Sequence, residues 1–292
     1  EYLFVNGQLT INKTEYTGVL AGEFVAKKQP TLSLSFPQQS DIYLDVSASP
    51  IQKPWAFLAP HENENIVNDY VAEKIMQHGG IFGVLRQQGQ RHVQLRINDE
   101  LYEIDPNRIF TDTGRQNTLS RLNPDLKPSS VSYQQALART ESLAEFILDT
   151  LKAQQATSWI AIHNNTNGYD GDDKNGRGTI SIKRYQKKLD SGANYLIQVH
   201  DAGNDEDDLF FISDPNDFAI MAAANWNVVL QNPEVANDPR EDDGSLSVLA
   251  EMQGKRYINV EAEREDNGFG TNSVKAQKAM VDLTFQILKD DK

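Results

Sequence analysis

The sequence predicts an α/β domain built on a mixed, mostly parallel sheet flanked by helices, with a small β segment in front of it. From Trp55 onward, short apolar runs typical of buried strands alternate with helical patterns, which is the signature of this class. Residues 1–50 lack helical patterns and alternate with period two instead. The 292 residues, 39% of them hydrophobic, suffice for one large core. We therefore divide the chain into a β domain or extension at 1–50 and an α/β domain at 51–292.

The β segment contains three strand patterns. Residues 2–11 alternate around an Asn6-Gly7 turn, which is a hairpin signal. Residues 31–36 and 41–46 also alternate, and the segment closes at Pro50 and Pro54. Whether it forms a separate small domain or an extension laid on the main domain stays open.

The main domain is predicted from its apolar runs and turn signals. Strands are expected at 55–59, 81–86, 92–97, 101–104, 159–162, 227–230 and 257–263, with a turn at Asn98-Asp99. Helices are expected at 65–78, at 129–154, after Asp214-Pro215 and at 273–288.

Composition excludes several classes of protein. The formal net charge of −14 would repel a polyanion, so no nucleic-acid partner is expected. No apolar run approaches the roughly 18 residues that a membrane span needs. The chain has no cysteine, which excludes disulfides, thiolate metal sites and cysteine nucleophiles. With Glu1 as its first residue, the chain is expected to be periplasmic or secreted after loss of a signal peptide, and a cytosolic location stays open.

Three predicted strands end in polar side chains. The strand before Pro60 runs into His61 and Glu64, and the strand at 159–162 runs into His163. The strand at 257–263 carries Glu261 and Glu263. If these strands are parallel neighbours, the side chains meet at one edge of the sheet, where ligands bind in α/β proteins.

This set of side chains has the chemistry of a catalytic Zn²⁺ site. Imidazole and carboxylate groups are good zinc ligands, and a hydrolytic site keeps one position for water. His61 and Glu64 are three residues apart in a turn that opens a helix, so both can reach one ion, with His163 as the third ligand. Glu261 would take the proton from the water. Glu263 shares the same strand face and stays a substitute for that role.

These motifs resemble the zinc carboxypeptidase superfamily, in particular its aspartoacylase and succinylglutamate desuccinylase branch. The resemblance rests on His61-x-x-Glu64, on residues 105–110 (DPNRIF), on His163 and on Glu261, in this order. It implies a mixed α/β sandwich, a single zinc, and binding of a substrate carboxylate by Asn107 and Arg108. A guanidinium fork beside an amide suits a carboxylate.

The chain departs from that family at two places. It lacks the Asn-Pro segment with a further arginine that would stabilise the oxyanion, and Arg96 lies in a predicted hairpin strand, so Arg108 itself stays a candidate for that role. Glu62 stands where family members often have glycine.

A second segment, Ala161 to Asn165 (AIHNN), is similar to the Ser-Ile-His-Ala-Asn segment of zinc-dependent N-acetylmuramoyl-L-alanine amidases. Both resemblances imply a zinc hydrolase that cleaves an amide or peptide bond, with a cell-wall-derived peptide as a substrate common to both. The alternative is a binding module that holds such a ligand without turnover. A calcium-loop pattern at Asp170–Gly176 is broken by Lys174. The oligomeric state stays open.

Overall fold

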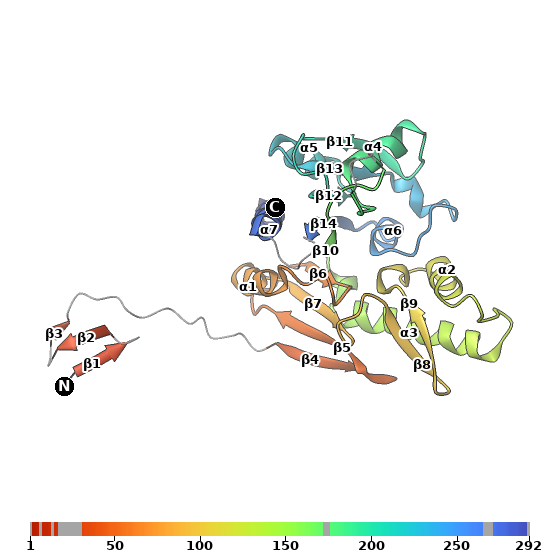
Figure 1. Cartoon of the computed structure of the whole chain (residues 1–292), viewed down its shortest axis with the longest axis horizontal. Helices are drawn as coiled ribbons and strands as arrows, with labels where there is room; N and C mark the ends of the chain where they lie inside the picture. The colour runs from red at the N-terminus through yellow and green to blue at the C-terminus, as the bar shows by residue number, and fades with distance from the viewer. Residues whose placement is uncertain are drawn as a thin grey trace. The chain divides into compact units, whose positions relative to one another are not determined.

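The computed structural model describes residues 31–171, 176–264 and 271–290, together with three short strands near the start of the chain (Figure 1). It divides into two units, Glu1–Pro30 and Thr31–Lys292. In the first unit, β1 (Tyr2–Val5), β2 (Gln8–Asn12) and β3 (Glu15–Tyr16) form an antiparallel sheet. The predicted Asn6-Gly7 turn and most of the Asp170–Gly176 segment lie outside the described residues.

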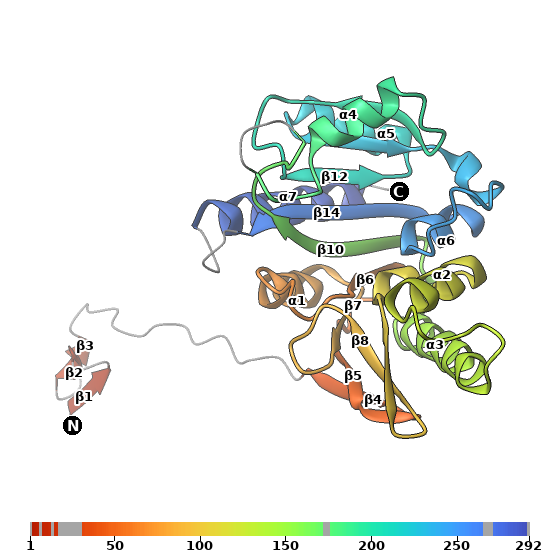
Figure 2. The ribbon, with the colours of Figure 1, turned by 45° about the vertical axis from the view of Figure 1, so that its right-hand side comes forward.

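A nine-stranded sheet forms the centre of the second unit, in the order β11-β13-β12-β14-β10-β6-β7-β5-β4 (Figure 2). The bounds are β4 Leu32–Phe36, β5 Gln39–Ala48, β6 Trp55–Ala59, β7 Ile81–Arg86, β10 Ser158–Thr166, β11 Leu196–His200, β12 Leu209–Ile212, β13 Asn227–Gln231 and β14 Arg256–Arg264. The four central strands, β14, β10, β6 and β7, are mutually parallel, whereas antiparallel pairs dominate toward both edges. The predicted mixed α/β class is therefore confirmed.

Helices cover both faces of this sheet, which gives three layers. The helices are α1 Asn68–His78, α2 Asp112–Leu122, α3 Val131–Thr150, α4 Ile182–Asp190, α5 Pro215–Ala223, α6 Leu246–Met252 and α7 Thr271–Asp290. One core contains side chains of α1, α5 and α7, where Phe57 of β6 stacks on Phe285 at 5.0 Å between ring centroids. A second core contains side chains of α2, α3 and α6. None of the described helices has the length and apolar character that a membrane crossing requires.

A β-hairpin packs into the second core beside α3. Its strands, β8 (Val93–Ile97) and β9 (Glu100–Ile104), pair antiparallel. Asn98 and Asp99 connect them with φ of 49° and 66°, the left-handed values that the tight hairpin turns of this type need. The predicted turn is confirmed.

The boundary between the units differs from the one we predicted at residue 50. Strands β4 and β5 belong to the main sheet, because β5 pairs antiparallel with β7 from Tyr43 opposite Arg86 to Ala48 opposite Ile81. The division falls after Pro30 instead. Period-two alternation tells which face of a strand is buried, but it does not tell which strand is its partner.

Candidate metal centre and cavity

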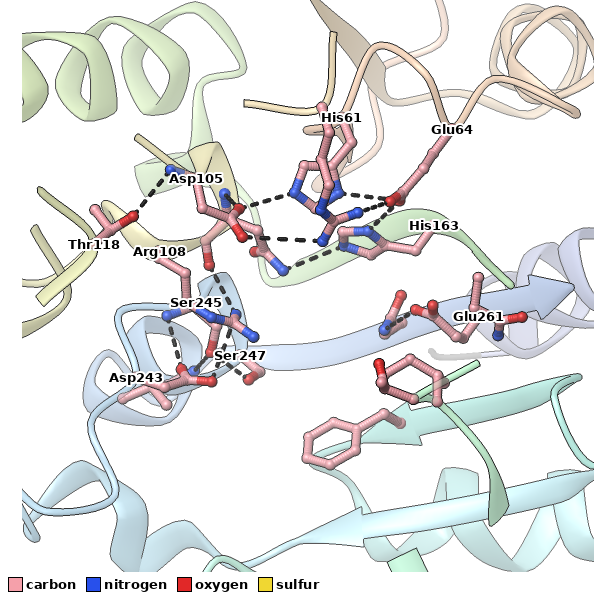
Figure 3. A pocket seen from close by; sticks show the side chains of 18 of the residues that line it. His61, Glu64, Asp105, Arg108, Thr118, His163, Asp243, Ser245, Ser247 and Glu261 are labelled. Carbon is pink, nitrogen blue, oxygen red and sulfur yellow. Dashed lines mark hydrogen bonds and ion pairs between the residues drawn. The ribbon is translucent and has the colours of Figure 1, made fainter. Parts of the chain in front are cut away.

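The three polar-ended strands are neighbours at the centre of the sheet. β10 pairs parallel with β6 on one side and with β14 on the other, and the register sets His163 directly opposite Glu261. The carboxyl ends of these strands therefore meet at one edge. The structure brings together the side chains that the sequence predicted to converge there (Figure 3).

His61, Glu64 and His163 form a compact, buried group at this edge. Each side chain is at most 4% exposed as a residue, and one ligand atom from each lies within 4.8 Å of the others. His61 Nδ1 is 3.0 Å and His163 Nδ1 is 2.8 Å from the same atom, Glu64 Oε2. The turn that opens after β6 allows this, since the Glu64 amide donates to the His61 carbonyl at 3.0 Å.

The donor set fits a zinc ion. Although His61 Nδ1 is close to Glu64, it has no hydrogen-bond partner with suitable geometry and is buried. A buried imidazole nitrogen left without a hydrogen bond is costly unless another ligand satisfies it. Two imidazole nitrogens and one carboxylate, all converging, are the three protein ligands that catalytic zinc sites use.

The opposite nitrogens of both imidazoles contact polar side chains that orient the rings. His61 Nε2 is 2.9 Å from Asp105 Oδ1. Asp105 is itself fixed, because its amide donates to Thr118 Oγ1 at 2.9 Å and its carboxylate caps the 3₁₀ helix Pro106–Arg108. His163 Nε2 is 3.4 Å from Asn107 Nδ2. The Asp105 carboxylate accepts from His61 Nε2 and so fixes the tautomer of that ring, whereas Asn107 Nδ2 can only donate and restrains the orientation of the His163 ring alone.

Burial and the neighbouring side chains both act on the pKa values of this group. Burial opposes ionisation of Glu64, but His61 and His163 lower its pKa well below the usual range. Burial also opposes protonation of His61, yet Glu64 and Asp105 raise its pKa. The pKa of Asp105 is lowered by His61 despite burial.

Glu261 and Glu263 share a strand face but occupy different environments. Glu261 is 7% exposed, lines the cavity beside the candidate metal centre and accepts a hydrogen bond from Asn259 Nδ2 at 3.1 Å. Its pKa is raised, first by burial and then by the negative charge of Glu64, while His163 opposes the shift. Glu263 belongs instead to a group with Asp205 and Asp207.

The cavity has a volume of about 1190 Å³ and is rich in arginine. Among the described residues, its lining includes seven arginines: Arg91, Arg108, Arg121, Arg177, Arg184, Arg240 and Arg264. The same lining carries six carboxylates, Glu64, Asp105, Glu241, Asp242, Asp243 and Glu261, so arginines and acids both line the cavity.

Arg91 is a site residue that the sequence reasoning missed. It lies in the connection between β7 and β8, contacts Glu64 through Nη1, and has Nη2 3.9 Å from Asp105 Oδ2. Arg96, which we had considered from the sequence, is exposed and is not among the residues that line the cavity. The only indication of Arg91 in the sequence was that it lies between the two motifs that contain Glu64 and Asn107.

Arg108 lines the cavity beside the segment 242–247, next to Asp243 (Figure 3). Its Nη1 donates to the Asn107 carbonyl at 3.0 Å and lies 3.5 Å from Asp243 Oδ2. The segment is held in place by Gly244, which has φ of +79°; a Cβ there would lie 2.4 Å from the Gly114 Cα. The Asp243 carboxylate beside Arg108 accepts a hydrogen bond from the Ser245 amide at 2.9 Å.

The fold and the site define an α/β protein with a buried candidate metal centre at the carboxyl edge of its central strands. No family model matches the sequence, and no curated protein matches it. Among solved structures, the tripeptide-bound cell shape determinant Csd4 of Helicobacter pylori is similar with a TM-score of 0.38 and 12% identity, over 83% of this chain and 55% of that one. The apo form of that protein is similar with a TM-score of 0.38 and 13% identity, over 83% of this chain and 54% of that one. The chain thus spans about half the length of those chains. A Shewanella frigidimarina protein named as a candidate succinylglutamate desuccinylase/aspartoacylase is similar with a TM-score of 0.35 and 10% identity. This match covers 88% of this chain and 71% of that one.

Proposed function

We propose that this protein is a zinc-dependent hydrolase of an amide or peptide bond, with His61, Glu64 and His163 as the metal ligands. The observation that carries the proposal is the buried convergence of these three side chains around a His61 nitrogen that lacks a hydrogen-bond partner. Zinc held by these residues would supply Lewis-acid chemistry, namely activation of the attacking water and polarisation of the scissile carbonyl.

Glu261 is the general base of the proposed reaction. It lies opposite His163 in the strand register and faces the cavity. Burial and the charge of Glu64 raise its pKa, which brings it closer to the value at which a carboxyl group both takes up and releases a proton near neutral pH. It takes a proton from the attacking water and passes it to the leaving amine.

Two arginines are assigned to oxyanion stabilisation and to substrate binding. Arg91, beside Glu64 and Asp105, donates to the oxyanion that develops on the attacked carbonyl. Arg108, which also lines the cavity, binds a carboxylate of the substrate, with the Asn107 amide next to it. Asn107 also contacts His163, and we assign it the second role of orienting this proposed ligand.

The proposed substrate is a small peptide or acyl amino acid with a free carboxylate, which includes peptides derived from the cell wall. The Arg108 guanidinium beside Asn107 in the cavity lining supports a substrate with a carboxylate. We place the enzyme outside the cytoplasm, in the periplasm or secreted, in keeping with the absence of cysteine.

A metal analysis combined with a hydrolysis assay tests this proposal against that of a non-catalytic binding module. Purified protein should contain about one zinc per chain and hydrolyse members of a panel of acyl amino acids and short peptides. His61→Ala and His163→Ala should each lose the metal, because two protein ligands seldom hold zinc tightly. His200→Ala is the matched control, since His200 lies in β11 and does not line the cavity. Full zinc content in all variants would refute the site, and zinc binding without turnover of any substrate would favour the binding module.

A further inference from the structure

A second group of oxygen ligands lies on the same strands as the candidate active site, two residues further along. The strand register explains how it forms. Asn165 of β10 lies opposite Glu263 of β14, and Leu209 of β12 lies opposite Glu261. Because β12 runs antiparallel to β14, Asp207, two residues before Leu209, comes beside Glu263. By this register Asn165, Glu263 and Asp207 form a row across the ends of β10, β14 and β12, three strands that lie side by side in Figure 2.

The carboxylates of this row are close together and shielded from water. One ligand oxygen each from Asp205, Asp207 and Glu263 lies within 4.8 Å of the others. Asp207 is 0% and Glu263 is 5% exposed, whereas Asp205 is exposed and leaves an entry path. Asp208 adds a further buried carboxylate, which accepts a hydrogen bond from the Glu263 amide at 3.1 Å.

Two buried oxygens of the row lack a hydrogen-bond partner. Asp207 Oδ2 accepts from the Gly168 amide at 2.5 Å, but Asp207 Oδ1 accepts from nothing. The second is Oδ1 of Asn165, a neutral side chain that is 9% exposed and whose Nδ2 donates to the Asp207 carbonyl at 2.7 Å. That hydrogen bond holds the Asn165 amide against Asp207, beside Glu263.

Within 31–171, 176–264 and 271–290, no lysine or arginine forms an ion pair with Asp207 or Asp208. The nearby Lys183 pairs with Glu206 instead. Ligand oxygens of Asp205, Asp207 and Glu263 lie within 4.8 Å of one another, and repulsion between carboxylates this close is relieved by a cation that all of them bind.

We propose that Asp205, Asp207 and Glu263, with the side-chain oxygen of Asn165, form a second metal site that binds Ca²⁺. The donors are all oxygens, and a set of carboxylates with an amide carbonyl in irregular geometry is the preference of calcium rather than of zinc. The ion would fix Gly168 and Tyr169, whose amides donate to Asp207 and Glu206, at the end of the segment that brings Thr166 to the cavity. This site is separate from the His61, Glu64 and His163 group and does not depend on the reaction proposed above.

Thermal unfolding in calcium tests the proposal on the full, zinc-saturated chain. Buffers are freed of calcium with a resin, and CaCl₂ or MgCl₂ is then added at equal ionic strength. At a hundredfold excess of Ca²⁺ over its Kd, the Tm of the wild type should rise by about 5 °C. Asp207→Asn and Glu263→Gln should abolish most of this rise. Asp190→Asn, a change of the same type at an exposed position of α4, should keep it.

The expected pattern contains a reversal that a merely structural role would not give. Without calcium, Asp207→Asn should be at least as stable as the wild type, because it removes one of the repelling charges; with calcium, it should be less stable. His163→Ala should keep the calcium effect, which separates this site from the candidate zinc centre. The proposal is overturned by any of three results: no rise in Tm in millimolar calcium, an equal rise in all variants, or loss of the rise in His163→Ala. Glu263→Gln decides the matter if Asp207→Asn does not fold.

Discussion

Asp105→Asn should weaken zinc binding without removing a ligand of the metal. Asp105 Oδ1 is 2.9 Å from His61 Nε2, and both residues are buried, at 6% and 1% exposure. This contact keeps the proton on Nε2 and leaves Nδ1 free for the metal. Asparagine has nearly the same shape and keeps an oxygen at Oδ1, so the cap of the 3₁₀ helix at Asn107 should survive. What the substitution removes is the negative charge.

The expected loss follows from the contact that is changed. A hydrogen bond to a charged, buried partner contributes about 1.5–3 kcal/mol, and the neutral bond that replaces it contributes about 1 kcal/mol. The difference of about 0.5–2 kcal/mol corresponds to a roughly 2- to 30-fold higher Kd for zinc. This range overlaps the 10- to 100-fold effect that is typical for a partner of a metal-binding histidine.

Competition with a chromophoric chelator measures this Kd directly. Asp112→Asn is the matched control, because Asp112 is exposed at the start of α2 and pairs with Arg115. His61→Ala gives the upper limit, since it removes the ligand itself. An unchanged Kd in Asp105→Asn, with binding lost in His61→Ala, would show that Asp105 does not orient the imidazole.

The remaining predictions concern the base, the carboxylate site and the acidic row. Glu261→Gln should keep zinc but lower turnover by roughly 100-fold or more, and Glu263→Gln should remain active; a reversed result in steady-state assays would make Glu263 the base. Arg108→Lys should raise KM for free-carboxylate substrates far more than for their amides, and equal effects would contradict carboxylate binding. Asp243→Asn removes a carboxylate 3.5 Å from Arg108, so affinity for free-carboxylate substrates should increase severalfold, whereas a decrease would show that Asp243 orients Arg108. Asp207 has a pKa raised to about 7 in the folded protein, against about 3.9 when unfolded, so without calcium its contribution to stability is present below pH 4 and is lost as the pH rises to 7. Urea unfolding at several pH values should show this loss in the wild type and a flatter profile in Asp207→Asn; parallel profiles would contradict it.

The sequence predicted the strands around the site well because their signal is local. The apolar runs before His61 and His163 correspond to β6 and β10, and the pattern that contains Glu261 corresponds to β14. Buried parallel strands are continuous apolar runs, and polar side chains at their ends stand out. Placing the three side chains together needed only the assumption that the strands are neighbours, which the structure bears out.

Features that depend on distant contacts were not predictable in this way. Helix α2 was missed because its sequence (DTGRQNTLSRL) has few apolar residues, and its start at the Thr111 cap is a weak signal without them. Arg91 reaches Glu64 from a hairpin connection, which no periodic pattern marks. Alternation placed Glu261 and Glu263 on one face, but two residues along a strand span about 7 Å. That distance separates Glu261, which lines the cavity, from Glu263, which does not.

The position of β14 in the sheet ties biosynthesis to function. β14 is the last strand in the part of the chain that the structure describes, yet it lies between β10 and β12 rather than at an edge. A nascent chain that has not yet released residue 264 from the ribosome therefore has two open strand edges at its centre, which favour association with other chains. The same strand brings Glu261 opposite His163. A truncated chain that ends before β14 therefore has unpaired edges on β10 and β12 and lacks the candidate base. Addition of β14 during synthesis both pairs these edges and completes the site.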